Sequence, residues 1–381
     1  MGARVGTVLV VGGTGPTGPP IVSGLVARGH DVTVFHTGRH EIAGAPDVPH
    51  LHGSPFSADG IAETLGERTF DTVVATYGRV RLLASHLAGR CGHFVAVGGV
   101  PVYAGYVDPS AVFPHGVPLP VHEDAARVAP DAPRSAGYDV APIRRTEDHV
   151  FALGEQGAFG ATYLRYPTIY GPRNPYAWEW NVVRRVLDGR RTVILADGGH
   201  GIHSRMAVRN AAEAVLLAVD KPEVASGKAY NVADDSFVTF RQWVQLVAEV
   251  AGGELEIRSL PWELASPGRA MSAFGGAESA CCVLDTTRLR EDLGYRDVVG
   301  LREGLAETVD WMRANEDLLR RNGTTDPFDY AAEDRLLSAY DAALTSLSAV
   351  SEPFSTGIGR MKVPQTAKGS LPETASGPCE R

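Results

Sequence analysis

The stretch Gly12-Gly13-Thr14-Gly15-Pro16-Thr17-Gly18 decides the fold. It follows a short β-rich apolar run, Thr7–Val11, and precedes a segment with helical apolar spacing, Ile21–Ala27. In a strand–turn–helix unit of this kind, one glycine makes the tight turn, a second lets backbone approach a pyrophosphate, and a third lets helix and strand pack closely. The free N–H groups at the helix N-terminus favour the phosphates. The stretch therefore predicts a dinucleotide-binding turn that uses Gly12, Thr14, Gly15, Pro16, Thr17 and Gly18.

Strands and helices alternate through the first half of the chain, which is typical of a parallel sheet covered on both faces. We therefore expect an α/β protein of the Rossmann type, with a doubly wound parallel sheet and a smaller C-terminal lobe. Apolar spacing predicts strands at Thr7–Val11, Asp31–Phe35, Thr72–Ala75, Phe94–Val97 and Ala161–Tyr166, and helices at Ile21–Ala27, Val80–Leu87, Ile143–Leu153, Trp180–Leu187, Ala211–Val219, Phe240–Ala251, Leu301–Ala314 and Leu336–Leu347.

The domain organisation follows from the same pattern. Residues 1–175, with parts of 205–235, are predicted to form the dinucleotide-binding domain. Residues 176–204 and 236–347 are predicted to form a lobe that binds the substrate. The segment Pro101–Gly137 has little periodicity, so we expect a long loop with a functional role. Residues 351–381 are rich in Ser, Pro, Thr and Gly, and are predicted to be a disordered tail.

Composition excludes several classes of function. The 381 residues include 36 Lys and Arg against 45 Asp and Glu, for a net charge of −9, and the basic residues form no stripe. A nucleic-acid surface is therefore disfavoured. No apolar run approaches the roughly 18–20 residues needed to span a bilayer, and no signal peptide is evident. Four cysteines without a zinc-type spacing fit a cytoplasmic protein. We expect a small-molecule substrate, and a homodimer remains open.

The position that selects the cofactor's ribose comes about 20 residues after the glycines. His36 stands there instead of the carboxylate that would bond a 2′-hydroxyl, and Asp31 lies too early in the strand. Arg39, three residues further on, is suited to pair with a 2′-phosphate. The sequence therefore predicts NADP(H) rather than NAD(H). The alternative is that Arg39 is an ordinary solvated loop cation.

Several motifs beyond the glycine turn resemble the extended, atypical short-chain dehydrogenase/reductase superfamily, whose members are similar to NAD-dependent epimerases and dehydratases. The resemblance covers residues 7–315 and implies a Rossmann domain with a smaller substrate lobe. We expect further cofactor contacts from Val97, Tyr166, Thr168 and Ile169. The motifs that carry the resemblance are Phe94–Val97 leading to Val102-Tyr103, Pro120–Asp124, Gly137-Tyr138, Leu164–Pro172, Tyr230–Val232 and Asp285–Thr287.

The resemblance also implies a catalytic trio of Ser or Thr, Tyr and Lys, in which the tyrosine is the general acid/base. Tyr138 matches the tyrosine, but Gly99 stands at the hydroxyl position and Pro142 at the lysine position. Because proline is tolerated only in the first helical turn, either a helix begins near Pro142 or it kinks there. Arg145, seven residues after Tyr138, is a candidate replacement cation if one helix carries both. His122 is an alternative acid/base.

The substrate contacts are expected at the carboxyl ends of the strands. Metal binding is not expected, because neither His50 with His52 nor His200 with His203 has further ligands at a recognised spacing. Three functions stay open: hydride chemistry with a rearranged site, non-redox isomerase, dehydratase, cyclase or lyase chemistry, and ligand binding without catalysis. The candidate substrate residues are Tyr103, Tyr176, Trp178, Trp180, Asn181, His203 and Arg205.

Overall fold

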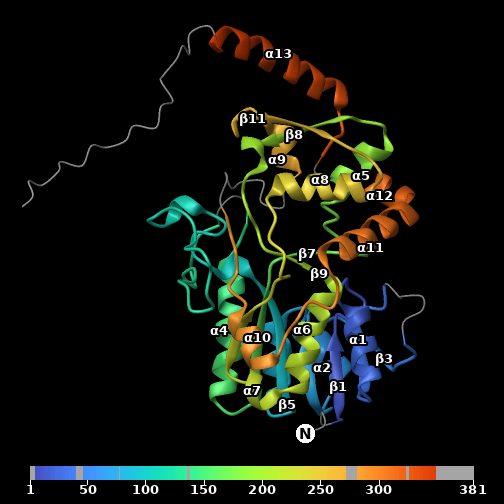
Figure 1. The fold of residues 1–381 in the computed structure, drawn as a ribbon. Coiled ribbons are helices and arrows are strands. Elements are labelled where there is room, and N and C mark those ends of the chain that lie inside the picture. Colours follow the sequence, from blue (N-terminus) through green and yellow to red (C-terminus); the bar gives the residue numbers. More distant parts are fainter. Residues whose placement is uncertain are drawn as a thin grey trace, which may run out of the picture. The chain divides into compact units, whose positions relative to one another are not determined.

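Seven parallel strands form the central sheet of the computed structural model, in the order β10-β6-β5-β4-β1-β2-β3 (Figure 1). This is the doubly wound order with one strand added beside β6, which confirms the predicted fold class. The structure describes residues 5–39, 46–76, 78–134, 138–271, 281–322 and 326–348. The strands are β1 (Thr7–Val11), β2 (Asp31–His36), β3 (His50–His52), β4 (Phe70–Ala75), β5 (Cys91–Gly99), β6 (Gly160–Tyr166) and β10 (Lys228–Asn231).

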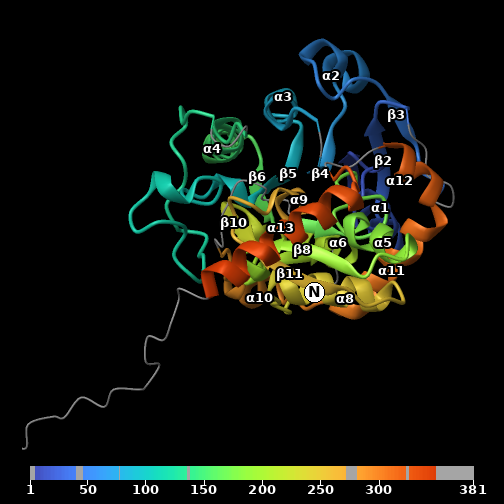
Figure 2. The same ribbon diagram turned by 90° about the horizontal axis from the view of Figure 1, so that it is seen from above.

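Helices cover both faces of this sheet (Figure 2). On one face the side chains of Val10, Leu25 and Val215 belong to one buried apolar cluster. On the other face Leu9 and Phe94 belong to a second cluster. Alternate residues of a buried strand therefore supply both cores, as the period of two requires. The first face carries α1 (Gly18–Ala27), α6 (Val208–Asp220), α7 (Pro222–Ala225) and α10 (Thr287–Leu293), and the second α2 (Ala58–Leu65), α3 (Val80–His86) and α4 (Ala141–Glu155).

A third apolar cluster, which includes Trp180, Val244 and Leu305, lies outside the sheet and forms the core of a smaller lobe. Two short parallel pairs accompany it: β8 with β11, and β7 with β9, where Thr168 is the register partner of Arg205. The elements of this region are β7 (Thr168–Tyr170), α5 (Trp180–Leu187), β8 (Thr192–Ala196), β9 (Arg205–Ala207), α8 (Phe240–Val250), β11 (Glu256–Leu260), α9 (Ser266–Ala270), α11 (Leu301–Ala314) and α12 (Glu316–Asn322).

The chain divides into two compact units, Met1–Phe328 and Asp329–Arg381. The second unit contributes α13 (Tyr330–Ser348) to the described residues. The predicted division at 175 and 235 falls inside the first unit and stays a prediction, and the predicted tail 351–381 lies outside the described residues. Within the described part of the chain, no helix is both long enough and apolar enough to cross a bilayer.

Strong periodic segments were predictable to within a few residues. The expected bounds of β1, α5 and α11 agree with the structure, and α4 and α6 extend the expected helices by two to three residues at their N-termini. The segment predicted as a long loop is irregular as far as residue 134, apart from two short 3-10 turns, Val100–Val102 and Pro109–Ala111. The unpredicted elements are mostly short, such as β3 and β9, because three residues carry almost no periodic signal.

Candidate active site

The glycine turn has the geometry that its sequence predicts. Gly12 adopts a φ of 95°, a region that residues with a Cβ rarely enter. The Gly15 N–H donates to the Gly12 carbonyl at 2.9 Å, and the Gly18 N–H donates to the Gly15 carbonyl at 3.1 Å. A Cβ on Gly18 would lie 2.3 Å from the carbonyl carbon and oxygen of Gly13. The turn therefore depends on glycine for backbone conformation at its start and for close packing at its end.

A cleft opens beside this turn. Its lining includes Gly13 and Thr14 of the turn, Val34 of β2, and His50 of β3. Thr14, Gly15 and Pro16 are partly exposed, whereas Thr17 and Gly18 are buried under the start of α1. The N-cap residue Thr17 makes no side-chain capping bond, and prolines occupy the first helical turn. Pro19 of this first turn also lines the cleft, so the N-terminus of α1 borders the position expected for the phosphates.

The end of β2 is the position where selection of the cofactor's ribose is expected. His36, the last residue of β2, is buried with 4% of its surface exposed. Arg39 is exposed, and no carboxylate lies among residues 36–39. The structure thus retains the arrangement that led to the NADP(H) prediction, an arginine without a competing acid, and that preference stays a prediction.

The corner after β5 departs from the related enzymes in its side chains. A Cβ on Gly98 would lie 2.3 Å from the Tyr163 hydroxyl, so this phenol fills the space beside the strand end. At Gly99 a Cβ would lie 3.1 Å from the Pro101 ring. Neither position supplies a hydroxyl, and both are crowded by groups already in place.

Pro142 occupies the first turn of α4, so the helix begins there and does not kink. Tyr138 consequently lies before the helix, with 50% of its surface exposed. Burial of its hydroxyl end, and then the neighbouring Tyr176, raise the pKa of the Tyr138 phenol. A phenol in this state holds its proton at neutral pH and is better suited to donate one than to accept one.

The two candidate substitutes for the usual relay have other partners. Arg145 lies on α4 while Tyr138 does not, so the continuous helix face that the proposal required does not exist. Its guanidinium donates to the Pro130 carbonyl at 2.6 Å. His122 has a side chain that is 63% exposed and lies 3.1 Å from the Asp285 carboxylate. The helix face that the Arg145 prediction required is therefore absent, whereas the role of His122 as an acid/base stays a prediction.

Tyr106, which the sequence analysis did not single out, has two of the candidate site residues near it. Tyr106, in the loop after β5, is 7% exposed, and burial raises the pKa of its phenol well above the ordinary value. The smaller influences on that pKa come from Cys282, Arg205 and Tyr138. Tyr106 thus lies within electrostatic reach of both the candidate acid and an arginine. No local pattern could have indicated this, because the neighbours come from distant segments.

A cavity collects several of the predicted residues. Thr168, Trp178 and Arg205 line it together with Glu179 and Trp243. The Arg205 guanidinium lies 4.4 Å from the centroid of the Trp243 ring, a cation–π distance. Trp178 also stacks on the exposed Tyr176, with rings 6.5 Å apart and inclined by 8°. Three of the predicted contacts therefore meet in one place, although they were assigned separately to cofactor and substrate.

An acidic and a basic side chain, Glu179 and Arg205, line this cavity and are shielded from solvent. Burial raises the pKa of Glu179 to about 7, against the opposing effects of a backbone hydrogen bond and of Arg205. Burial lowers the pKa of Arg205 to about 10, against the opposing effects of Glu179 and Tyr106. One Glu179 oxygen, Oε2, is buried and accepts no hydrogen bond from any described residue. The cavity therefore offers a hydrogen-bonding group and a cation to a polar ligand.

Burial corrects the other predicted substrate contacts. Trp180 and Asn181 are fully buried, and the Asn181 amide reaches the Ala270 carbonyl at 3.4 Å. Tyr103 is 1% exposed, and its hydroxyl donates to Asn231 at 2.6 Å. His203 pairs by its backbone with Cys282, and its carbonyl accepts from Arg205 at 3.2 Å. Trp180, Asn181 and Tyr103 are therefore core residues and not open contacts.

The predicted cofactor contacts outside the turn also differ in their surroundings. The Tyr166 hydroxyl donates to the Ala211 carbonyl at 3.0 Å and so holds β6 to α6. Val97 and Ile169 pack against the apolar cluster beneath the sheet. Thr168 lines the cavity that contains Arg205. Tyr166 is corrected to a packing residue.

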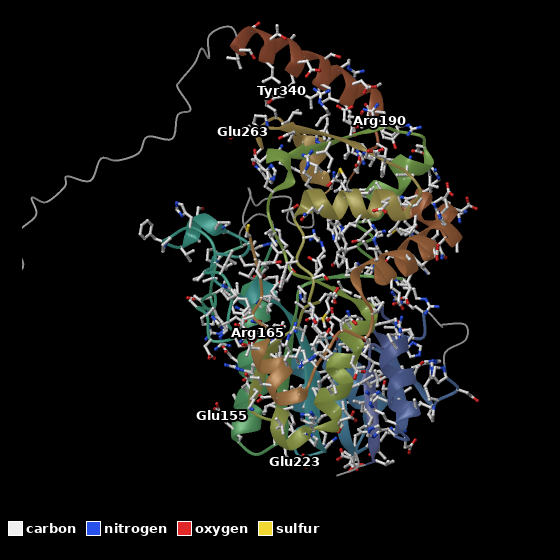
Figure 3. All side chains as sticks on the ribbon, in the orientation of Figure 1. Glu155, Arg165, Arg190, Glu223, Glu263 and Tyr340 are labelled. Carbon is white, nitrogen blue, oxygen red and sulfur yellow. The ribbon has the colours of Figure 1, made fainter. Side chains whose placement is uncertain are left out.

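Arg165, on β6 (Figure 3), is the centre of a buried polar network. The Arg165 guanidinium donates to the Glu147 carboxylate at 2.6 Å and 3.0 Å, and to the Tyr103 hydroxyl at 2.7 Å. The side chains of Arg165 and Glu147 are 3% and 1% exposed. These groups join β6, α4 and the loop after β5, so they fix the frame on which the site is built.

Comparison with known proteins agrees with this geometry. The family model of the NAD dependent epimerase/dehydratase family matches residues 78–233. A UDP-N-acetyl-alpha-D-glucosaminuronate decarboxylase of Bacillus cytotoxicus is 26% identical over 81% of this chain and 98% of its own length. A 3-diazoavenalumate denitrifying reductase of a Streptomyces species is 29% identical over 68% of this chain and 85% of its own.

Solved structures show the same fold. A dTDP-glucose 4,6-dehydratase of Bacillus anthracis, in complex with NAD, superposes with a TM-score of 0.63 at 16% identity, over 82% of this chain and 98% of its own. A UDP-glucose 4-epimerase of Thermotoga maritima gives 0.63 at 20% identity, over 81% and 99%. Residues 78–233 therefore resemble the NAD dependent epimerase/dehydratase family, and the solved structures share the fold of this chain.

Proposed function

We propose that the protein is an NADP(H)-dependent enzyme that reduces, oxidises or epimerises a small organic substrate, with a nucleotide-linked sugar as the first class to test. The observation that carries the proposal is the glycine turn with its open cleft. Two relatives named above act, by their names, on nucleotide sugars or nucleotide-sugar acids. The cofactor, when bound, supplies reversible hydride exchange with a carbon of the substrate.

The protein's part in this chemistry is to hold the substrate and to move one proton. Tyr138 is the proposed proton donor, because it stands at the position of the family's tyrosine, is 50% exposed, and is protonated at neutral pH. Donation to a developing alkoxide favours the reductive direction. Arg205, beside Tyr106, is the proposed cation of the site in place of the family's lysine. Glu179 and Arg205 then hold polar groups of the substrate in the cavity that both line.

The domain division supports this assignment. We propose that the sheet and its helices, residues 1–175 with parts of 205–235, bind the cofactor, and that 176–204 and 236–328 form the substrate lobe. The separate apolar cluster around Trp180 and Val244 supports an independent core for that lobe. The prediction extended the lobe to residue 347, but α13 belongs to the second unit.

A test uses Tyr138→Phe, with Tyr340→Phe as the control, because Tyr340 lies on α13 and is not among the candidate site residues. NADPH consumption would be followed with the 4-keto derivative of dTDP-glucose as the carbonyl probe. General acid catalysis contributes typically about 10²–10⁴-fold, so we expect a loss of that size for Tyr138→Phe and little change for Tyr340→Phe. Product formation that continues without any nicotinamide cofactor would instead support isomerase or lyase chemistry.

A second candidate function is reduction of a small aromatic molecule. The cavity lined by Trp178, Phe240 and Trp243 is rich in aromatic surface, which suits a flat ligand. One relative is named as a reductase of 3-diazoavenalumate. Offering both 3-diazoavenalumate and the keto-sugar probe with NADPH separates the two candidates by which substrate is consumed.

A further inference from the structure

Three histidines come together at the edge of the sheet. His36 ends β2, and His50 and His52 are the first and last residues of β3. The strands pair in parallel with His36 opposite His52. Register partners on adjacent strands face the same side of a sheet, and so do residues two apart on one strand. All three imidazoles therefore project from one face of this edge.

Their rings are arranged as ligands of one small cation would be. His36 and His50 are inclined by 81°, His36 and His52 by 89°, and His50 and His52 by 90°. One ring nitrogen of each histidine lies within 4.8 Å of the others. Nitrogens this close can share one cation after a small side-chain adjustment, because tetrahedral Zn²⁺–N bonds of about 2.0–2.1 Å place the ligand nitrogens about 3.4 Å apart. Three imidazoles meeting in this way leave a fourth position of a tetrahedral site for water.

The surroundings leave that position accessible. His36 is buried, His50 is partly buried, and His52 is exposed. Solvent therefore reaches the cluster from the side of His52, while His36 anchors it to the sheet. Imidazole nitrogens suit Zn²⁺ and the neighbouring transition metals, whereas Mg²⁺ and Ca²⁺ prefer oxygen ligands. The chemical class that the donors select is a late first-row divalent cation.

The competing role for this cluster is a plain hydrogen bond between strands. His36 Nε2 lies 2.9 Å from His50 Nδ1, and the Gly38 N–H donates to His36 Nδ1 at 3.3 Å. In that state the His36 proton is on Nε2. A cation at Nε2 would move the proton to Nδ1 and open the long contact with Gly38. The two roles therefore predict different proton positions and different responses to metal.

We propose that His36, His50 and His52 form a binding site for one Zn²⁺-like cation per chain. The sequence predicted no metal, because no third ligand follows His50 and His52 at a recognised spacing. The third ligand comes from the neighbouring strand, through the pairing of β2 with β3. The cluster is separate from the cavity of Arg205, but His50 also lines the cleft beside the glycine turn, so the test measures Zn²⁺ binding and not activity.

The experiment titrates Zn²⁺ into the full chain after removal of any affinity tag and treatment with a chelator. Calorimetry should give one Zn²⁺ per chain. His50→Ala and His52→Ala should each weaken binding by at least about 10-fold, the loss typical of removing even a supporting partner of a metal ligand. His115→Ala, which removes an exposed loop histidine, is the matched control and should bind as the wild type does.

Two further measurements separate loss of the metal site from loss of folding. Substituted Co²⁺ should show the visible absorption of a tetrahedral nitrogen site, and this absorption should disappear in His52→Ala. Circular dichroism and melting should show that His52→Ala folds, because its side chain is exposed. Failure to bind Zn²⁺, or binding that persists unchanged in both variants, overturns the proposal and leaves a hydrogen-bonded histidine pair.

Discussion

The two corners of the sheet that face the site are built in different ways. The turn between β1 and α1 is made of backbone, with Gly12 at a positive φ and Gly18 packed against a carbonyl. The corner formed by β5, β6 and α4 is made of buried polar side chains, with Arg165 and Glu147 at its centre. The first corner keeps the glycines that a dinucleotide-binding turn needs. The second has Gly99 and Pro142 where the resemblance implies a hydroxyl residue and a lysine. Cofactor binding and proton transfer can therefore change independently.

The largest expected effect concerns the polar corner. Glu147→Gln removes one charge from a pair whose side chains are at most 3% exposed, and leaves Arg165 buried without a compensating carboxylate. Breaking such a pair costs about 3–5 kcal/mol. Urea unfolding should show this loss in the free energy of unfolding. Glu155→Gln, at the exposed end of the same helix (Figure 3), should change it by less than about 0.5 kcal/mol. Similar small values for both would mean that this corner is not held by the ion pair.

The second largest expected effect is a pH-dependent change in the free energy of unfolding, caused by Glu179 in the cavity. Glu179 has a pKa raised to about 7, so the folded protein favours the protonated acid. The stability that this preference supplies is complete below the unfolded value near 4.5 and is lost as pH rises through about 7. At about 1.4 kcal/mol per pKa unit, the loss is about 3 kcal/mol. Glu179→Gln should remove that pH dependence.

The measurement compares the free energies of unfolding of wild type and variant at pH 5 and pH 8. Glu179→Gln should gain on the wild type at pH 8, and the difference should shrink toward pH 5. Glu263→Gln, an exposed glutamate (Figure 3), should show no such trend. A difference between variant and wild type that is the same at both pH values would show that folding does not shift the pKa of Glu179.

A substitution in the glycine turn between β1 and α1 should lower the affinity for NADP⁺ by a comparable free energy. Gly18→Ala would place a Cβ 2.3 Å from the Gly13 carbonyl, so α1 must shift by about 1 Å to reach ordinary contact. A displacement of that size typically costs about 100-fold. We expect this loss in NADP⁺ affinity by fluorescence titration. Gly300→Ala, a glycine before α11 with open space around it, should bind NADP⁺ normally. Normal affinity in Gly18→Ala would mean that the turn does not position the pyrophosphate.

The contrast between the corners also explains what the sequence could predict. The glycine turn is local, because Gly12, Gly15 and Gly18 follow one another within a single strand–turn–helix unit, and its interpretation agrees with the structure. The helix start at Pro142 was one of two alternatives, and the ring's missing N–H made it foreseeable. The positions of Tyr106, Glu179 and the histidine cluster depend on strand pairing over long separations. Tyr103, Trp180 and Asn181 were misassigned because aromatic and amide side chains pack cores as readily as they line pockets.

The smallest expected effect tests the cofactor preference at the backbone corner. Arg39 is exposed, so its attraction to a 2′-phosphate is screened and worth about 1 kcal/mol, or roughly fivefold to tenfold in affinity. Arg39→Ala should lower NADP⁺ affinity by that factor and leave NAD⁺ affinity unchanged. Arg81→Ala, an exposed arginine on α3, controls for the loss of net charge and should alter neither. If the wild type binds NAD⁺ more tightly than NADP⁺, Arg39 is a solvated loop cation and another group selects the ribose.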